Sequence, residues 1–182
     1  MVMNLELQEL FLLCTIRHIV LPDFREELFM EELKNLVIEK TTKTPRIELI
    51  HGSGEVSFSG KSLPENASRI YEPVLTWVTD YILNPKPVTN LRLNLEYFNT
   101  SSMLWISKII KALTRINNPD YRLMVHIYIP LEEYDDMKET ADIRESFNPL
   151  TDILQHSIPE VSMKLYATDD TSHVIRDAVV LF

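Results

Sequence analysis

The stretch 99–102, with the sequence NTSS, carries the side chains best suited to chemistry in this chain, three hydroxyls and an amide. It lies where the strand-like pattern of residues 91–98 changes into the helix-like pattern of residues 103–113. The first backbone N–H groups of a helix lack intrahelical partners, and the helix dipole is positive at that end. The stretch is therefore predicted to be a helix start that accommodates an anion.

The flanking segments indicate how this stretch is positioned. In residues 91–98 the apolar side chains alternate with polar ones, which predicts a strand with one buried face formed by Leu91, Leu93, Leu95 and Tyr97. In residues 103–113 the apolar side chains recur at spacings of three and four, which predicts a helix whose buried stripe is Met103, Ile106, Ile109, Ile110 and Leu113.

Composition limits the function classes. A chain of 182 residues that is 45% hydrophobic suits one globular domain, and its net charge of -9 argues against binding nucleic acid or anionic membranes. The single cysteine, Cys14, excludes an internal disulfide. We expect a cytoplasmic protein without a signal peptide, membrane span, metal or cofactor, whose partners are proteins or small molecules.

The first half of the sequence predicts an extension, a hairpin and a helix. Residues 5–20 have a helical pattern, but residues 1–29 are an N-terminal extension of uncertain status, and the coherent domain is 30–182. Alternation on both sides of the HGSG stretch predicts a hairpin over 46–59. A nucleotide-binding loop is disfavoured, because Glu55 occupies the position where GxxxxGK[ST] requires glycine.

Further helices and strands follow. Ser62 and Glu65 form an S-x-x-E capping box, which predicts a helix start. The buried stripe of that helix is expected to be Ile70, Val74, Val78, Tyr81 and Ile82, with Trp77 on its flank. Alternation predicts strands over 122–129 and 161–166, separated by a segment, 131–155, that is helical but interrupted at Asn148 and Pro149. Residues 168–172 are expected to cap a short final helix.

This order predicts an α/β fold with a mixed sheet of about five strands. Helices that connect successive strands make those strands parallel. Parallel strands covered on both faces read as continuous apolar runs, whereas these strands alternate. The helices are therefore expected mainly on one face, with a semi-polar face opposite.

Two segments resemble the SiaC family of bacterial regulatory phosphoproteins, which has a STAS-like fold. They are GKSLPENASRIYEPVLTWVTDYI at 60–82 and LEYFNTSS at 95–102. The resemblance implies a non-enzymatic switch, phosphorylated on Thr100 by a partner Ser/Thr kinase and dephosphorylated by a PP2C-type phosphatase. It further implies that the unphosphorylated protein binds and activates an output protein such as a diguanylate cyclase.

Two interpretations of the NTSS stretch stay open together. Pattern alone favours helix capping, since Asn, Ser and Thr are the preferred N-cap residues, while the resemblance favours phosphorylation. One side chain suffices for the cap, so both can hold. We expect Thr100 at the centre of a partner-binding face whose other members are Glu65, Asn66, Asn99, Ser101 and Ser102.

Alternative functions are an antagonist that sequesters an anti-sigma factor or other regulatory kinase, and a small-molecule sensor that uses the semi-polar sheet face. An enzyme is disfavoured, because no nucleophile with a paired histidine and acid is evident. The acidic residues at 132–136 are expected to complement a helix dipole rather than to bind a cation.

Overall fold

The computed structural model describes most of the chain beyond residue 32. The described residues are 33–140, 148–169, 171 and 173–181, with the side chains of 137–140, 148 and 178–181 left out. They belong to one compact unit, Leu33–Phe182. The helix expected over 5–20 and the extension expected over 1–29 lie outside the described residues.

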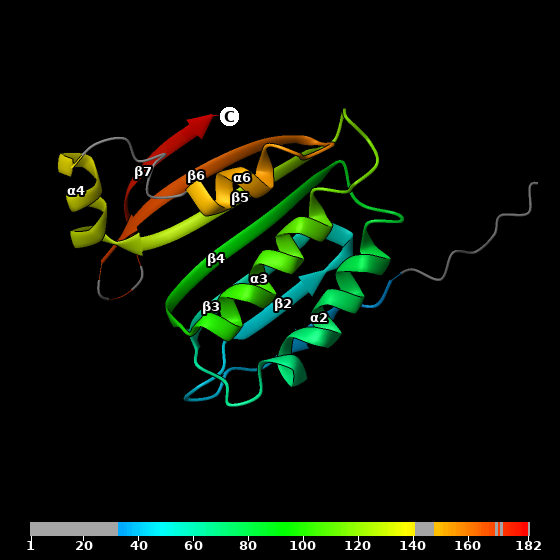
Figure 1. Cartoon of the computed structure of the whole chain (residues 1–182), viewed down its shortest axis with the longest axis horizontal. Helices are drawn as coiled ribbons and strands as arrows, with labels where there is room; N and C mark the ends of the chain where they lie inside the picture. Colours follow the sequence, from blue (N-terminus) through cyan, green and yellow to red (C-terminus); the bar gives the residue numbers. More distant parts are fainter. Residues whose placement is uncertain (1–32, 141–147, 170, 172, 182) are drawn as a thin grey trace, which may run out of the picture. The chain divides into compact units, whose positions relative to one another are not determined.

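Figure 1 shows strands and helices that alternate along the middle of the chain. The elements are β1 (Leu36–Ile38), β2 (Arg46–Ile50), the 3-10 turn η1 (His51–Ser53), β3 (Glu55–Ser62), α2 (Ala67–Tyr81), β4 (Val88–Phe98), α3 (Thr100–Leu113), β5 (Arg122–Pro130), α4 (Leu131–Thr140), α6 (Asn148–Leu154), β6 (Glu160–Thr168) and β7 (Val174–Leu181).

The described strands form one seven-stranded sheet, in which spatial order follows chain order from β1 to β7. The pairs β1–β2, β2–β3 and β6–β7 are antiparallel, and the three helix-connected pairs from β3 to β6 are parallel. In Figure 1, α2, α3 and α6 lie on the same face of this sheet. The predicted mixed α/β fold with helices mainly on one face is confirmed, with seven strands rather than about five.

The predicted hairpin between β2 and β3 is confirmed, and a glycine closes it. Gly54 has φ 69°, in the left-handed region. A Cβ atom there would also collide with the carbonyl oxygen of Val88. Both the backbone conformation and the lack of space therefore exclude a residue larger than glycine. Residues Glu55–Ser62 form the strand β3, so this segment is not a nucleotide-binding loop.

The core lies between the sheet and helices α2 and α3. Phe58 of β3 stacks on Tyr71 of α2 with ring centroids 6.2 Å apart. Trp77, expected on the flank of its helix, is buried and donates a hydrogen bond to the Lys34 carbonyl at 2.7 Å. The rest of the predicted stripe on α2 is buried or half-buried, as expected.

Three expected boundaries are wrong. Ser62 is the last residue of β3 and Asn66, four residues later, caps α2, so Ser62 and Glu65 do not form a capping box. Asn148 begins helix α6 instead of interrupting one, and Pro149 falls in the first turn, where its missing N–H costs nothing. The segment after Thr168 leads into strand β7, not a helix, because it pairs along β6.

The face of the sheet opposite the helices is semi-polar, as predicted. Arg92 donates to Glu55 at 2.8 Å and to the Tyr128 hydroxyl at 3.1 Å. The ring nitrogens of His126 lie 2.9 Å from the Tyr166 hydroxyl and 3.2 Å from the Asn90 side-chain oxygen. These polar groups therefore satisfy one another.

Candidate partner-binding site

Two helices begin side by side at the carboxyl ends of the parallel strands β3 and β4. Ser62 and Phe98, the last residues of these strands, are opposite one another in the ladder. The Asn99 backbone N–H extends the pairing by donating to the Ser62 carbonyl at 3.0 Å. Because parallel neighbours end at the same edge of a sheet, α2 and α3 start close together.

An asparagine caps each helix. The Asn66 side-chain oxygen accepts from the Arg69 N–H at 3.3 Å, and that of Asn99 accepts from the Ser102 N–H at 2.9 Å. The Asn99 amide also donates to the Pro64 carbonyl at 3.3 Å. Asn99 therefore caps α3 and ties its start to the segment that leads into α2. The predicted cap within the NTSS stretch is confirmed and is provided by its asparagine.

Ser102 lies in a buried hydroxyl cluster beneath the two helix starts. The Ser62 hydroxyl donates to the Ser102 hydroxyl at 2.8 Å, and the Ser102 hydroxyl donates to the Ser62 carbonyl at 3.0 Å. The Tyr71 hydroxyl is 2.6 Å from the Ser62 hydroxyl, and burial raises the pKa of Tyr71. Ser62 and Ser102 are fully buried. Ser102 therefore connects α3 to β3 and is not exposed to solvent, and its expected contact with a partner stays a prediction.

Thr100 and Ser101 are exposed on the first turn of α3. Thr100 is the first residue of the helix, and neither side chain makes a hydrogen bond within the described part of the chain. The first turn of α3 contains no acidic residue. A group added to the Thr100 hydroxyl would therefore be in solvent, at the positive end of the helix dipole and with no carboxylate in its own helical turn.

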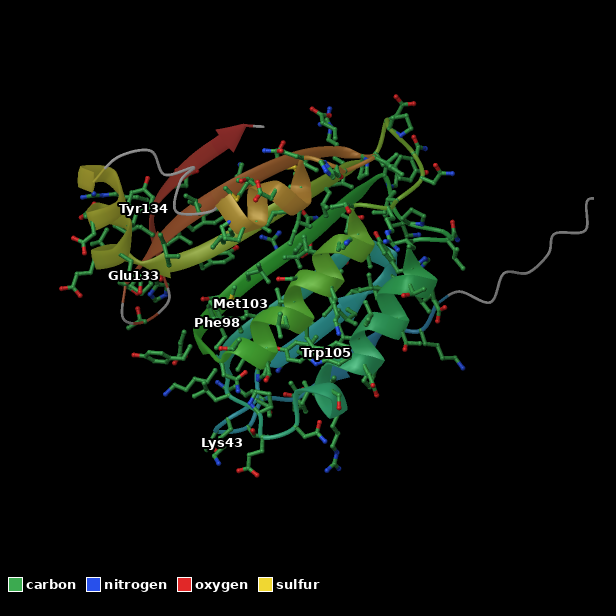
Figure 2. All side chains as sticks on the ribbon, in the orientation of Figure 1. Lys43, Phe98, Met103, Trp105, Glu133 and Tyr134 are labelled. Atoms are coloured by element: carbon green, nitrogen blue, oxygen red, sulfur yellow. The ribbon has the colours of Figure 1, made fainter. Side chains whose placement is uncertain are left out.

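Four large apolar side chains that lie within four residues of Thr100 in the sequence are exposed. They are exposed by 64%, 52%, 47% and 60% at Tyr97, Phe98, Met103 and Leu104, respectively. Figure 2 shows Phe98 and Met103 beside the start of α3. We name these four residues the apolar patch. Exposed apolar residues grouped in this way are typical of protein interaction sites.

Two members of the apolar patch, Tyr97 and Met103, are exposed although the sequence pattern predicts them to be buried. Tyr97 and Met103 were predicted to be buried, from alternation on β4 and from the stripe on α3. The period of α3 is as predicted, but in β4 the register along β3 shifts between Leu95 and Tyr97, so that Glu96 has no partner and the alternation of faces is interrupted. Beyond Leu93, β4 also no longer pairs with β5. The sequence pattern reveals neither the register shift nor the separation from β5, because both depend on the neighbouring strands.

The start of α2 is polar by contrast. Glu65 is exposed and accepts a 2.7 Å hydrogen bond from the Lys43 ammonium group. This bond lowers the pKa of Glu65 and raises the pKa of Lys43. Asn66 is also exposed, but its oxygen is used by the cap and by the Ser68 hydroxyl at 2.8 Å. Both predicted residues are thus accessible at the same sheet edge as Thr100.

Other kinds of site find little support in the described residues. They contain no group of three or more His, Cys, Asp or Glu side chains that could hold a metal ion. None of the helices among them has the length and apolar character needed to cross a membrane.

The family is identified by comparison. The model of the SiaC family regulatory phosphoproteins matches residues 38–156, which is more than half of the chain. The chain therefore belongs to this family. It is also 32% identical over 81 residues to an uncharacterised protein of Pseudomonas aeruginosa strain UCBPP-PA14; the match covers 44% of this chain and 64% of that relative, less than two thirds of its length.

Solved structures support the same conclusion. Apo-SiaC from Pseudomonas aeruginosa aligns with a TM-score of 0.52 and 25% identity, covering 58% of this chain and 88% of that one. The structure of the diguanylate cyclase SiaD in complex with its activator SiaC, from the same organism, aligns with a TM-score of 0.52 and 25% identity, covering 60% of this chain and 90% of the matched one.

Proposed function

We propose that this protein is a signalling switch in which reversible phosphorylation of Thr100 controls docking of a partner protein on the apolar patch. The observation that carries the proposal is an exposed threonine at a helix start with four exposed apolar side chains within four residues of it. Membership of a family of regulatory phosphoproteins supports it. Asn99, Ser101, Glu65 and Asn66 form the polar margin of the proposed face.

The switch must act through the partner, because the helix itself is too weak. A helix dipole stabilises a nearby negative charge by about 0.3–1 kcal/mol at an exposed site. Reversing a binding equilibrium from 1:99 to 99:1 needs about 5.5 kcal/mol of differential affinity. A phosphate that a docked partner covers loses its hydration and carries close to two negative charges, which costs several kcal/mol unless the partner pairs it. Phosphorylated Thr100 is therefore expected to block docking.

The proposed output partner is a diguanylate cyclase. One structural neighbour was solved as a complex of such a cyclase with its activator SiaC, and that activator has the fold found here. The enzymes that set the state of Thr100 would be a Ser/Thr protein kinase and a PP2C-type phosphatase. This chain would itself be non-enzymatic and act in the cytoplasm.

The test combines acceptor mapping with partner capture. The chain, treated with the cognate kinase, should yield one major phosphopeptide, modified at Thr100, by mass spectrometry. A diguanylate cyclase should be captured by the wild type and by Thr100→Ala but not by Thr100→Asp. Thr76, an exposed threonine on α2, is the matched control, and Thr76→Asp should capture as well as the wild type. Modification elsewhere, or capture by Thr100→Asp equal to wild type, contradicts the proposal.

The same capture experiment distinguishes the proposed cyclase activator from an anti-sigma-factor antagonist. An anti-sigma-factor antagonist would retain a regulatory kinase as its stable partner, with no cyclase in the eluate. The small-molecule sensor gains no support from the open face, because Arg92 and His126 there are engaged by neighbouring side chains.

A further inference from the structure

Strands β4 and β5 separate before either of them ends. Their ladder stops at the pair Leu93 and Ile127. Beyond it, β4 continues along β3 as far as Phe98, and β5 continues along β6 as far as Pro130. Figure 1 shows the two strands diverging. Among the described strands, residues 94–98 and 128–130 therefore have no ladder partner on the sides that face each other.

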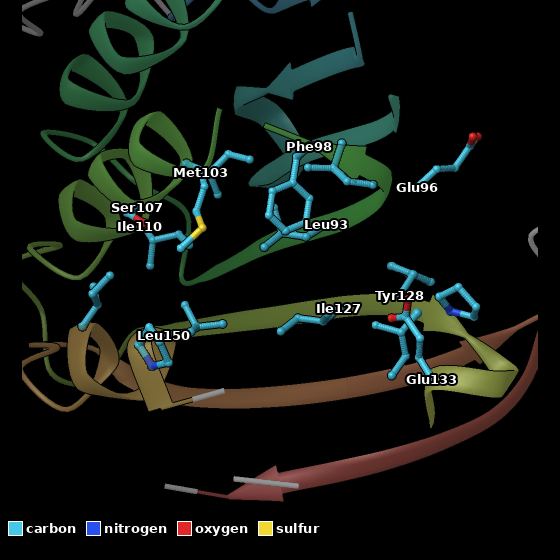
Figure 3. Close-up of a pocket in the computed structure, with 16 residues that line it drawn as sticks. Leu93, Glu96, Phe98, Met103, Ser107, Ile110, Ile127, Tyr128, Glu133 and Leu150 are labelled. Carbon is cyan, nitrogen blue, oxygen red and sulfur yellow. The ribbon is translucent and has the colours of Figure 1, made fainter. Parts of the chain in front are cut away.

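A hollow space lies at this split. A cavity of about 470 Å³ is bounded by the end of β4, the first turns of α3, the end of β5 and helix α6. Figure 3 shows Phe98 and Met103 on one side of it and Ile127 and Tyr128 on the other. A second cavity, of about 780 Å³, borders the same strand ends. Leu95 and Tyr128 line both, so both cavities border the separated strands.

The lining of the split combines apolar surface with negative charge. Among the residues whose side chains the structure describes, the charged ones that line the two cavities are all acidic: Glu96, Glu132, Glu133 and Asp169. Glu132 and Glu133 are exposed and form no ion pair within the described ranges, whereas the Glu96 carboxylate lies 3.8 Å from the Lys61 ammonium group. No lysine, arginine or histidine with a described side chain lines either cavity. Charge complementarity therefore favours an occupant that carries Lys or Arg.

We propose that the split between β4 and β5 receives an extended, Lys/Arg-bearing segment of a partner protein as an additional strand. Unpaired backbone N–H and C=O groups along a strand edge are complemented by an extended backbone, as in β-augmentation. Five residues of such a segment span about 16 Å, which matches the length of the unpaired part of β4. Alternate side chains would enter the apolar cavity, while basic side chains meet Glu96, Glu132 and Glu133.

This site goes beyond the Thr100 switch. Phe98 and Met103 belong to both the apolar patch and the split, so the two surfaces are continuous. Thr100 lines neither cavity. Binding of a basic segment in the split therefore does not require a particular state of Thr100, and the two proposals can fail separately.

The probe is the fluorescent peptide Lys-Val-Lys-Val-Lys-Val with blocked ends, titrated with the full chain and followed by fluorescence anisotropy. It should bind saturably, whereas the Glu-Val analogue should not. Methylating alternate backbone nitrogens of the peptide should weaken its binding at least about tenfold, because it removes the hydrogen-bond donors along one edge of the peptide strand. Equal binding of the acidic or the methylated peptide overturns the proposal.

Chain variants locate the peptide. Replacing Glu96, Glu132 and Glu133 together with Gln should weaken binding at least about tenfold. The matched control, Glu72→Gln with Asp80→Asn and Asp120→Asn, changes the net charge equally on exposed residues elsewhere and should alter it less than about twofold. Equal losses in both triple variants contradict the site.

Hydrogen exchange gives a readout that non-specific charge attraction does not produce. Peptide binding should slow exchange of backbone amides within 94–98. Protection of the edge strand β7 instead would place the peptide on the wrong strand and overturn the proposal. Thr100→Asp should leave peptide affinity within about twofold of wild type, and a large loss in that variant would contradict the independence of the two surfaces.

Discussion

The starts of α2 and α3 are built alike but are surrounded differently. Each follows a parallel strand, begins at the same sheet edge and is capped by an asparagine. Around α2 the exposed surface is polar, with the Lys43–Glu65 ion pair and one large apolar residue, Leu63, 41% exposed. Around α3 it is the apolar patch. The asparagine cap therefore stabilises the start of each helix. The exposed side chains around it determine whether that start can also bind a partner protein.

Removing the apolar patch should strongly weaken binding of the partner. Phe98→Ser together with Met103→Ser should weaken binding of the output partner by about 2 kcal/mol or more, which is about 30-fold, because apolar anchors dominate interface energies. Isothermal titration calorimetry measures this. Leu63→Ser at the start of α2 is the matched control and should leave affinity within about twofold. Equal losses of partner affinity in the two variants would mean that the apolar patch is not what makes the start of α3 a binding site.

Acid should destabilise the protein chiefly through a buried histidine of the sheet. Burial, reinforced by the charge of Arg92, lowers the pKa of His126 to about 4. An unfolded histidine has a pKa of about 6.5, so the unfolded state binds more protons between these values, and stability falls as pH falls through that window. The loss should approach about 3 kcal/mol by pH 4.

Urea unfolding at several pH values checks this dependence. His126→Gln should flatten it between pH 6.5 and 4, while Asn66→Gly and Asn99→Gly should keep the wild-type slope. An unchanged slope in His126→Gln would assign the acid sensitivity to other groups.

Two adjacent serines should differ in their contribution to stability. Ser102→Ala removes the acceptor that the Ser62 hydroxyl now uses and the donor to the Ser62 carbonyl, and should lower the free energy of unfolding by about 1–3 kcal/mol. Ser101→Ala, on the exposed side of the same turn, should stay within about 0.5 kcal/mol. Urea denaturation measures both, and similar values for the two variants would remove the role assigned to the hydroxyl cluster.

The smallest effect compares the two caps. Asn66→Ala should lower the free energy of unfolding by about 1 kcal/mol through loss of the cap. Asn99→Ala should cost about 1 kcal/mol more, because its amide also donates to the Pro64 carbonyl. Thermal or urea unfolding separates the two, and equal costs would show that the link between the helix starts contributes nothing to stability.

Local periodicity predicted the elements whose pattern is long. The alternation in β4 and β5, the stripe on α3 and the cap before Thr100 were all readable, because each depends on residues a few positions apart. One-sided helices also followed from alternating strands between helical connections. The resemblance, not the pattern, directed attention to Thr100.

The errors concern features that depend on distant neighbours. β1 has only three residues and exists as a strand because Leu36 pairs opposite Leu49, which no short window reveals. β7 was predicted to be a helix because polar residues precede it, yet pairing along β6 makes it a strand. Exposure of Tyr97 and Met103 accompanies the register shift at Glu96 and the separation of β4 from β5, and neither has a signature in the sequence.

The most direct test is the affinity of the output partner for the chain quantitatively phosphorylated on Thr100, compared with the unphosphorylated chain. The account predicts that phosphorylation weakens binding at least about 100-fold, approaching the roughly 10⁴-fold that a complete switch needs, and that phosphatase treatment restores the original affinity. Equal dissociation constants for the two forms would contradict it.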